Sequence, residues 1–163
     1  MIFSSELRAR AFTLLGELRA RNLRLATAES CTGGLIAGLF TEIAGSSDVF
    51  ERGFVTYSND AKHELLGIPK NLLEMHGAVS EQVAQAMALG ALKHSHADVV
   101  IAVTGIAGPG GATEAKPIGL VHVAIARKDG AAVHRVFEFG DIGRTEVRLA
   151  TLDAALTLLS EFV

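Results

Sequence analysis

The sequence predicts an α/β fold: a three-layer α/β/α sandwich with a mixed, mainly parallel sheet and an antiparallel C-terminal hairpin. Strand-like segments alternate with helical ones along most of the chain, which indicates parallel pairing. Residues 98–104 are almost wholly apolar and β-branched, as in a central strand buried on both faces. Asp129-Gly130 joins two late strands and predicts the hairpin. The 163 residues contain no linker or repeat, so we expect one domain over residues 1–163.

The first half of the chain predicts helices and strands in alternation. Residues 4–22 carry leucine and alanine at helical spacing with charged residues between them, which predicts an amphipathic helix. A short strand follows over residues 23–28 and ends at the polar, small-residue segment 29–34. The next expected elements are a helix over 35–43, a strand over 50–58, a short helix over 59–66 and another short helix after the turn at 67–69.

The second half predicts one more helix before the buried strand, and then the hairpin. Ser80 is a typical N-cap and starts a helix that has Val83, Met87 and Ala91 on one face. The buried strand over residues 98–104 comes next. The last expected elements are a glycine-rich loop over 105–119, strands over 120–127 and 131–139, and a helix that turns Val147, Ala154, Leu158 and Phe162 inward.

Composition and charge exclude several classes of protein. A hydrophobic fraction of 49% and a charged fraction of 20% exclude a disordered chain. With 15 Lys and Arg against 18 Asp and Glu, the chain offers neither a basic face for nucleic acid nor a polybasic membrane anchor. No segment reaches the roughly 18 uncharged apolar residues of a membrane span, and the charged N-terminus does not resemble a signal peptide. We therefore expect a cytoplasmic protein that binds neither nucleic acid nor a membrane.

The cysteine and histidine residues argue against a disulfide and a metal site. Cys31 is the one cysteine, so no internal disulfide is available. The six histidines form no His-Glu-x-x-His pattern and no Cys/His cluster. His94 and His96 lie close in sequence, but at the end of a helix, where a positive charge suits the helix dipole. We therefore expect no metal and no cofactor.

Three clusters of polar and small residues each follow an apolar strand. They lie at residues 29–34, 57–62 and 104–111. In open α/β sheets, ligands bind beyond the carboxyl ends of the strands. The three clusters are therefore expected to converge on one edge of the sheet.

The first cluster offers two nucleophiles at the start of a helix. Ser30 precedes a Thr-Gly-Gly turn, where the backbone can approach a ligand closely and free N–H groups favour an anion or a developing oxyanion. The simpler alternative is that Ser30 or Thr32 caps the helix. Cys31 is a rival nucleophile because a helix N-terminus lowers a thiol pKa. It has no histidine base nearby in sequence, however, and its simpler role is that of a small buried hydrophobic residue.

In the second cluster, Tyr57 and Lys62 lie five residues apart. A lysine acts as a general base only when burial or nearby charge lowers its pKa far below about 10.4. Ser–Lys pairs then do the work of Ser–His pairs, and a tyrosine can relay protons. The alternative is an ordinary solvated lysine on a short helix.

The third cluster, residues 104–111, is too rich in glycine for a plain connection and could hold a phosphate or a ribose. It is not a P-loop, because the Gly-Lys-Ser/Thr ending is absent, and no Gly-x-Gly-x-x-Gly pattern follows the first strand. Arg144 lies near the start of the last helix, where the helix dipole disfavours a cation. Either an anionic ligand offsets this cost, or Arg144 is simply exposed to solvent.

Taken in order, these segments resemble the signature blocks of the CinA C-terminal domain family. The resemblance runs over residues 23–127 and consists of several long motifs in the same order. The matching blocks are residues 28–34 (AESCTGG), 57–59 (YSN) with Lys62, 77–80 (GAVS), 104–109 (TGIAGP), 110–111 (GG) and 116–119 (KPIG). One departure is Glu51-Arg52-Gly53, where we expect a glycine pair. Arg52 either enters the site or only changes the edge of the strand.

The resemblance implies a stand-alone nicotinamide-nucleotide amidohydrolase of the PncC type. Such enzymes convert nicotinamide mononucleotide to nicotinic acid mononucleotide and ammonia in pyridine nucleotide recycling. At the matching positions, the family's serine nucleophile, lysine and tyrosine are Ser30, Lys62 and Tyr57. We expect neutral Lys62, helped by Tyr57, to take the proton of Ser30, which then forms an acyl-enzyme. The residues expected to bind the substrate are Thr32, Gly33, Gly34, Asn59, Thr104, Gly105, Gly108 and Arg144.

Two other functions remain open on the sequence. The first is a non-catalytic, nucleotide-binding regulatory module related to the competence- and damage-inducible CinA proteins, which would bind pyridine nucleotides without releasing ammonia. The second is an interaction protein whose glycine-rich loop docks a partner. In every case, the uncovered apolar faces of so small a sandwich predict a homo-oligomer, a dimer or higher.

Overall fold

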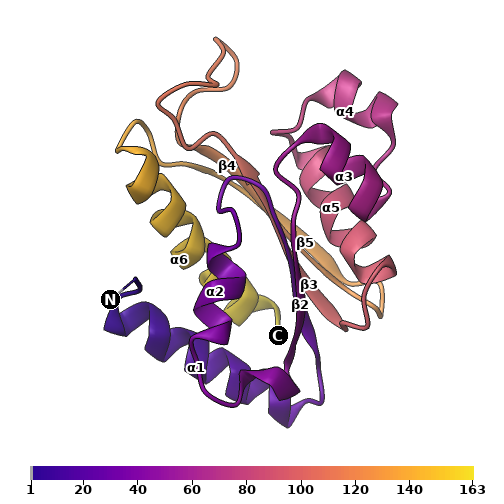
Figure 1. The fold of residues 1–163 in the computed structure, drawn as a ribbon, viewed down its shortest axis with the longest axis vertical. Helices are drawn as coiled ribbons and strands as arrows, with labels where there is room; N and C mark the ends of the chain where they lie inside the picture. The colour runs from indigo at the N-terminus through magenta and orange to yellow at the C-terminus, as the bar shows by residue number, and fades with distance from the viewer. Residues whose placement is uncertain (1) are drawn as a thin grey trace.

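A five-stranded sheet lies between two layers of helices in the computed structural model, which describes residues 2–163 (Figure 1). The helices are α1 (Ser5–Ala20), α2 (Leu35–Thr41), α3 (Asn59–Leu66), α4 (Lys70–His76), α5 (Glu81–Lys93) and α6 (Arg144–Phe162), with a 3₁₀ turn at Ser46–Asp48. The strands are β1 (Leu25–Glu29), β2 (Phe50–Val55), β3 (Val99–Gly105), β4 (Leu120–Arg127) and β5 (Ala132–Glu138). The predicted α/β/α sandwich is confirmed.

The sheet is mixed, with the strand order β2-β1-β3-β4-β5. β1 pairs in parallel with both β2 and β3, whereas β4 runs antiparallel to β3 and to β5. β3 is buried along almost its whole length, as the apolar sequence of this segment predicted. The predicted hairpin of β4 and β5 is also confirmed, and it leaves β2 and β5 as the two edge strands.

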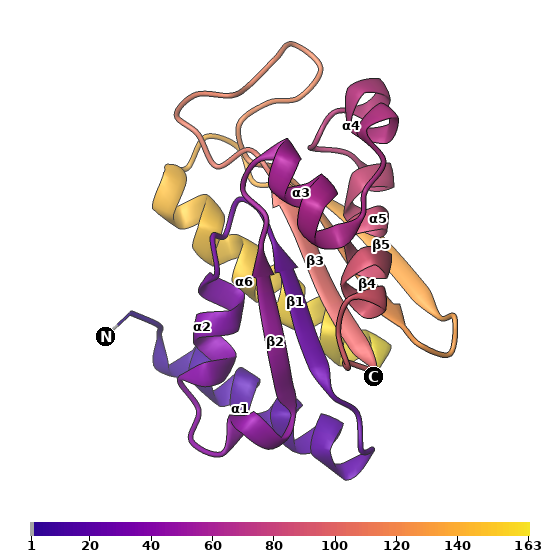
Figure 2. The same ribbon diagram turned by 45° about the vertical axis from the view of Figure 1, so that its right-hand side comes forward.

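Each face of the sheet has its own layer of helices and its own core (Figure 2). Helices α1, α2 and α6 cover one face with large side chains such as Leu15, Phe40 and Leu152. Helices α3, α4 and α5 cover the other face, where β1, β3 and β4 present alanines. Small side chains on this face of the sheet let α5 pack closely against it. Helix α5 also lies close to α3, because a side chain at Gly90 would collide with the Leu66 carbonyl.

Serine caps set the starts of three helices. The hydroxyls of Ser4, Ser58 and Ser80 accept hydrogen bonds from backbone amides in the first turns of α1, α3 and α5. The pairing of β2 with β1 ends at Val55 opposite Glu29, so the strand expected over residues 50–58 stops there, and Ser58 then caps α3. Within residues 2–163, no helix combines the length and hydropathy needed to cross a membrane.

Candidate active site

The three polar clusters meet at the carboxyl ends of β1, β2 and β3, as predicted from the sequence. They surround a cavity of about 290 Å³. Its lining residues are Ser30, Cys31, Tyr57, Asn59, Lys62, Ala78, Val79, Thr104, Gly105, Ile106, Ala107, Gly108, Gly110, Gly111 and Arg144. The cavity therefore combines one buried lysine, two nucleophile candidates and a glycine-rich loop.

Ser30 and Lys62 are in direct contact. The Nζ atom of Lys62 lies 3.0 Å from Oγ of Ser30 and donates a second hydrogen bond of 2.8 Å to the Thr56 carbonyl. The backbone of Ser30 is held in turn by β3, because its N–H donates to the Val103 carbonyl over 3.0 Å. The hydroxyl and the amine are thus joined across 32 residues of sequence with the geometry of a nucleophile and its base.

Lys62 is buried by the way α3 packs on the sheet. Lys62 and Leu66, four residues apart, face inward from α3, and the lysine side chain is only 1% exposed. Burial lowers the pKa of Lys62 from 10.5 to about 8, with a small opposing effect from Cys31. In the described part of the chain, Lys62 has no carboxylate partner. The solvated-lysine alternative is therefore wrong, and a neutral amine is accessible near pH 8.

Cys31 lacks the properties of a nucleophile. Its thiol is buried, and that burial raises its pKa to about 12. A thiol in such surroundings stays protonated at neutral pH and is a poor nucleophile. The interpretation of Cys31 as a small buried hydrophobic residue agrees with its place in the core on the α2 side.

Tyr57 lies at the rim of the cavity and is paired with Arg144. The phenol is 59% exposed, and its oxygen accepts a hydrogen bond of 2.6 Å from Nη2 of Arg144. Nη1 of Arg144 donates to the Gly108 carbonyl over 2.8 Å. Among residues 2–163, no hydrogen bond joins Tyr57 to Ser30 or to Lys62. Arg144, the first residue of α6, thus ties the second cluster to the third across the cavity mouth.

The start of α2 is occupied by a side chain of the protein itself. Glu29, fully buried at the end of β1, accepts hydrogen bonds from the amides of Gly34, Ile36 and Ala37 and from the hydroxyl of Thr32, at 2.7–3.1 Å. A carboxylate at a helix N-terminus is stabilised by these donors and by the helix dipole. The amide of Gly34, which we expected to be free for an anion, is therefore already bonded.

Thr32, Gly33 and Gly34 consequently build the turn and do not line the cavity. Thr32 is fully buried, and the amide of Gly33 donates to the Ser30 carbonyl over 3.0 Å. Both glycines have positive φ, at +60° and +96°, which side chains rarely tolerate. The sequence contains one signal for this role of Glu29, because an acidic residue just before a helix start is stabilised by the helix dipole.

The glycine-rich loop lines the cavity with main chain, and several of its residues also hold it in place. The hydroxyl of the buried Thr104 donates to the Ala78 carbonyl over 2.8 Å. A side chain on Gly105 would collide with Val121 of β4, and one on Gly108 would collide with Ile118. Thr104, Gly105 and Gly108, which we expected to bind the substrate, therefore line the cavity. The contacts that hold the loop in place also require these residue types.

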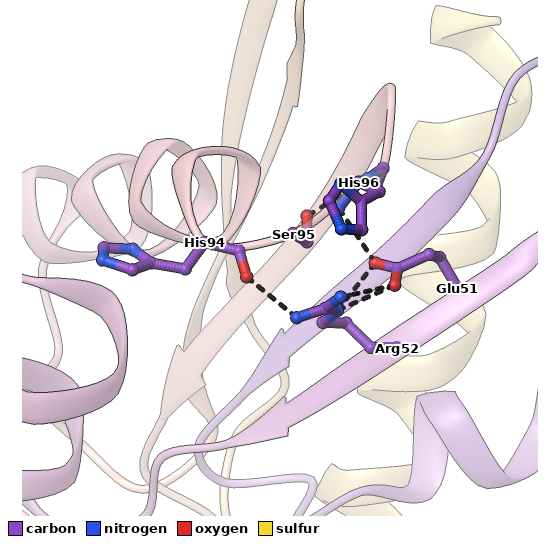
Figure 3. Close-up of polar contacts among 6 residues, drawn as sticks. Glu51, Arg52, His94, Ser95 and His96 are labelled. Atoms are coloured by element: carbon purple, nitrogen blue, oxygen red, sulfur yellow. Dashed lines mark hydrogen bonds and ion pairs between the residues drawn. The ribbon is translucent and has the colours of Figure 1, made fainter.

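Arg52 does not enter the site. Its guanidinium binds the Glu51 carboxylate and donates to the His94 carbonyl over 3.1 Å, while the amide of His96 donates to Glu51 (Figure 3). This network lies beside the beginning of β3, at the opposite end of the sheet from Ser30. Arg52 therefore affects only the edge of the strand. No cluster of three metal-ligating side chains occurs in the described residues.

The comparisons with known proteins agree on one family. A family model for the CinA C-terminal domain matches residues 8–163. The chain is 53% identical over 148 residues to a protein of Enterobacter agglomerans named nicotinamide-nucleotide amidohydrolase PncC, covering 90% of this chain and 89% of that protein. It is 50% identical over 147 residues to a putative competence-damage inducible protein of Caldicellulosiruptor bescii, of which it spans only 35%.

A solved structure has the same fold. The competence/damage inducible protein CihA from Agrobacterium tumefaciens is 51% identical and matches with a TM-score of 0.96 over 98% of this chain and 97% of that chain. The motif resemblance, the family model and the fold thus lead to the same assignment. The chain belongs to the CinA C-terminal domain family.

Proposed function

We propose that this protein hydrolyses the carboxamide of nicotinamide mononucleotide to nicotinic acid mononucleotide and ammonia, as a cytoplasmic enzyme of pyridine nucleotide recycling. The observation that carries the proposal is the 3.0 Å contact between Ser30 and a buried lysine whose pKa is lowered to about 8. The substrate itself is suggested by the printed name of the Enterobacter agglomerans relative, which this chain matches over most of both lengths.

The first half of the reaction is the attack of Ser30 on the carboxamide. Neutral Lys62 takes the hydroxyl proton while Oγ forms a bond to the carbonyl carbon, giving a tetrahedral intermediate. When that intermediate collapses, the carbon–nitrogen bond breaks, Lys62 returns the proton to the leaving nitrogen, and ammonia departs. The product of this half is a nicotinoyl ester of Ser30 that still carries the nucleotide.

The second half is hydrolysis of that ester. Lys62 is neutral again and takes a proton from water, the hydroxide adds to the ester carbonyl, and the bond to Oγ breaks. Lys62 then returns the proton to Oγ of Ser30. Nicotinic acid mononucleotide is released and the enzyme is regenerated. Tyr57, whose phenol lies at the cavity mouth, has a proposed role in orienting the substrate or relaying protons when Arg144 shifts onto the ligand.

The oxyanion needs donors other than the start of α2. The amides of Gly33 and Gly34 are already bonded within the turn. Cys31 lines the cavity and its amide makes no such bond in the described chain, so we assign the oxyanion to this amide. One donor of this kind is worth about 3 kcal/mol of transition-state stabilisation.

The nucleotide phosphate is assigned to the cavity mouth. Arg144 supplies the guanidinium, and the glycine-rich loop allows main-chain groups to approach the ligand closely. Asn59 lines the same cavity and offers an amide to the ribose hydroxyls. Because Glu29 fills the start of α2, we place no phosphate contact there.

The test is ammonia release from nicotinamide mononucleotide by the purified protein, with and without a metal chelator. We expect release that survives the chelator in wild type and is lost in Ser30→Ala, which should still bind the nucleotide. Wild-type-like release by Ser30→Ala would overturn the mechanism. Binding without release by wild type would instead favour the regulatory module, and thermal shift with the mononucleotide measures that binding directly.

A further inference from the structure

We propose that Arg148 is a positioning residue, which holds the turn that carries Ser30 in the geometry needed for acylation; this inference rests on the proposed function. Arg148 lies one helical turn after Arg144 on α6, on the face of the sheet that α6 shares with α2 (Figure 1). Arg144 lines the cavity, whereas Arg148 does not. Its Nη2 atom instead donates a hydrogen bond of 3.0 Å to the Thr32 carbonyl, in the turn between β1 and α2.

The turn after Ser30 has Cys31 and Thr32 as its central residues. The amide of Gly33 closes this turn by donating to the Ser30 carbonyl over 3.0 Å. The Thr32 carbonyl accepts two hydrogen bonds, one from Nη2 of Arg148 and one of 3.2 Å from the first amide of α2. Arg148 therefore fixes the peptide group that follows Thr32. Movement of that peptide would shift both the Ser30 hydroxyl and the Cys31 amide, on which attack and oxyanion binding depend.

Opposite charges bind the donors and the acceptor of this turn. Glu29 accepts hydrogen bonds from the Thr32 hydroxyl and the Gly34 amide, and Arg148 donates to the Thr32 carbonyl. Within residues 2–163, no ion pair joins Glu29 to Arg148. Each charge therefore acts on the peptide groups of the turn and not on the other charge.

The guanidinium of Arg148 has few partners for a partly buried charge. Its Nε atom is buried without a hydrogen-bond partner, and in the described part of the chain it forms no ion pair with a carboxylate. A partly buried charge that is matched so poorly costs stability. An apolar side chain of similar length would avoid that cost, so the fold alone does not explain an arginine at this position.

The charge of Arg148 also reaches the place where the oxyanion forms. Burial raises the pKa of the Cys31 thiol to about 12, and the positive charge of Arg148 opposes that rise. The field of the guanidinium therefore extends to the residue whose amide we assign to the oxyanion. A positive field at this point favours the negative charge that develops during the attack.

Steady-state kinetics of ammonia release separate this role from phosphate binding. Arg148→Met is expected to lower kcat about tenfold with a nearly unchanged KM, because the turn is displaced while the nucleotide contacts remain. The matched control is Arg19→Met, which removes an arginine that also donates to a main-chain carbonyl, that of Gly45, but lies outside the cavity lining. This control should keep both kcat and KM. An unchanged kcat in Arg148→Met, or a change confined to KM, would overturn the proposal.

Rescue of the activity separates the lost contact from lost packing. Arg148→Lys keeps a charged donor and is expected to recover part of the kcat that Arg148→Met loses. Guanidinium chloride at millimolar concentration, added to Arg148→Ala, is expected to raise kcat, whereas the same concentration of sodium chloride is not. Failure of both rescues would show that Arg148 acts through packing alone and would overturn the proposal.

Labelling of Ser30 by a sulfonyl fluoride tests the same role without the nucleotide. Oγ of Ser30 bonds to sulfur, fluoride leaves and Lys62 takes the hydroxyl proton, so the rate does not depend on which amide the enzyme hydrolyses. Mass spectrometry is expected to show labelling about tenfold slower in Arg148→Met than in wild type. If this difference is seen but wild type releases no ammonia from the mononucleotide, the proposed function fails and the role of Arg148 stands. Equal labelling rates, or no labelling of Ser30 in wild type, would overturn the role of Arg148.

Discussion

Replacing Lys62 with methionine is expected to stabilise the fold near neutral pH while removing turnover. The lysine is almost fully buried, and burial lowers its pKa from 10.5 to about 8. Below pH 8 it is protonated in the folded and the unfolded chain alike, so the folded chain carries a buried charge. The shift of about 2.5 units then corresponds to about 3 kcal/mol of stability lost at pH 7.

The pH dependence of this penalty has a definite sign. Between pH 8 and 10.5 the unfolded chain binds more protons at Lys62 than the folded chain does, so the stability of wild type rises with pH in that window. Methionine has no such transition. The advantage of Lys62→Met over wild type should therefore shrink by about 2 kcal/mol between pH 7 and 9.5. Methionine also loses the hydrogen bonds of Lys62 to Ser30 and Thr56, which lowers the stability of the variant by a similar amount at every pH. The quantity to measure is therefore the change with pH in the stability difference between the two proteins.

Urea denaturation of both proteins at pH 7 and at pH 9.5 measures this quantity, provided that the slope m is unchanged by the substitution. The matched control is Lys93→Met, which removes a lysine that is exposed at the end of α5. A difference between wild type and Lys62→Met that stays constant, or grows, as pH rises would refute the argument that burial lowers the pKa of Lys62. Ammonia release, assayed in parallel, should be absent in the variant at both pH values.

The remaining predictions concern the chemistry, the cavity mouth and the turn that carries Ser30. The rate of ammonia release by wild type should rise about tenfold between pH 6 and 7 and level off above pH 8, because only neutral Lys62 takes a proton; a flat profile over that range would contradict its role as base. Arg144→Met should raise the KM for the mononucleotide at least tenfold with a smaller change in kcat, and should leave the KM for a nucleoside lacking the phosphate nearly unchanged. Glu29→Gln should lower the free energy of unfolding by about 1–3 kcal/mol, since an amide group cannot accept all four of the present hydrogen bonds. At about 2–4 °C per kcal/mol, a melting curve resolves that loss, and an unchanged Tm would show that Glu29 does not hold the turn.

The position of the site could be predicted from the sequence because it depends on strand order and polarity alone. Polar clusters after β1, β2 and β3 must lie at one edge when these strands are parallel. The cap at Ser80 and the apolar run of β3 have equally local signals. Predictions of this kind need no knowledge of side-chain orientation.

The details that depend on burial could not be predicted in the same way. Nothing in the sequence around Glu29 shows whether its carboxylate points to solvent or folds back onto the start of α2. The contact between Tyr57 and Arg144 joins residues 87 positions apart and depends on where α6 begins relative to β2. Both details decide which donors remain available to a ligand. Sequence reasoning therefore could not show that the amides of Gly33 and Gly34 are already bonded within the protein.

The arrangement of the site follows from two buried groups with opposite effects on stability. The Glu29 carboxylate is matched by four donors, so its burial fixes the turn that carries Ser30 and the helix behind it. The Lys62 amine is matched only by a hydroxyl and a carbonyl, so its burial costs stability whenever it is protonated. That cost is the property a general base requires, because it brings the neutral amine within reach of physiological pH. In the proposed mechanism, the rigid turn holds Ser30 in place beside a lysine whose lowered pKa lets it act as the base at the same point.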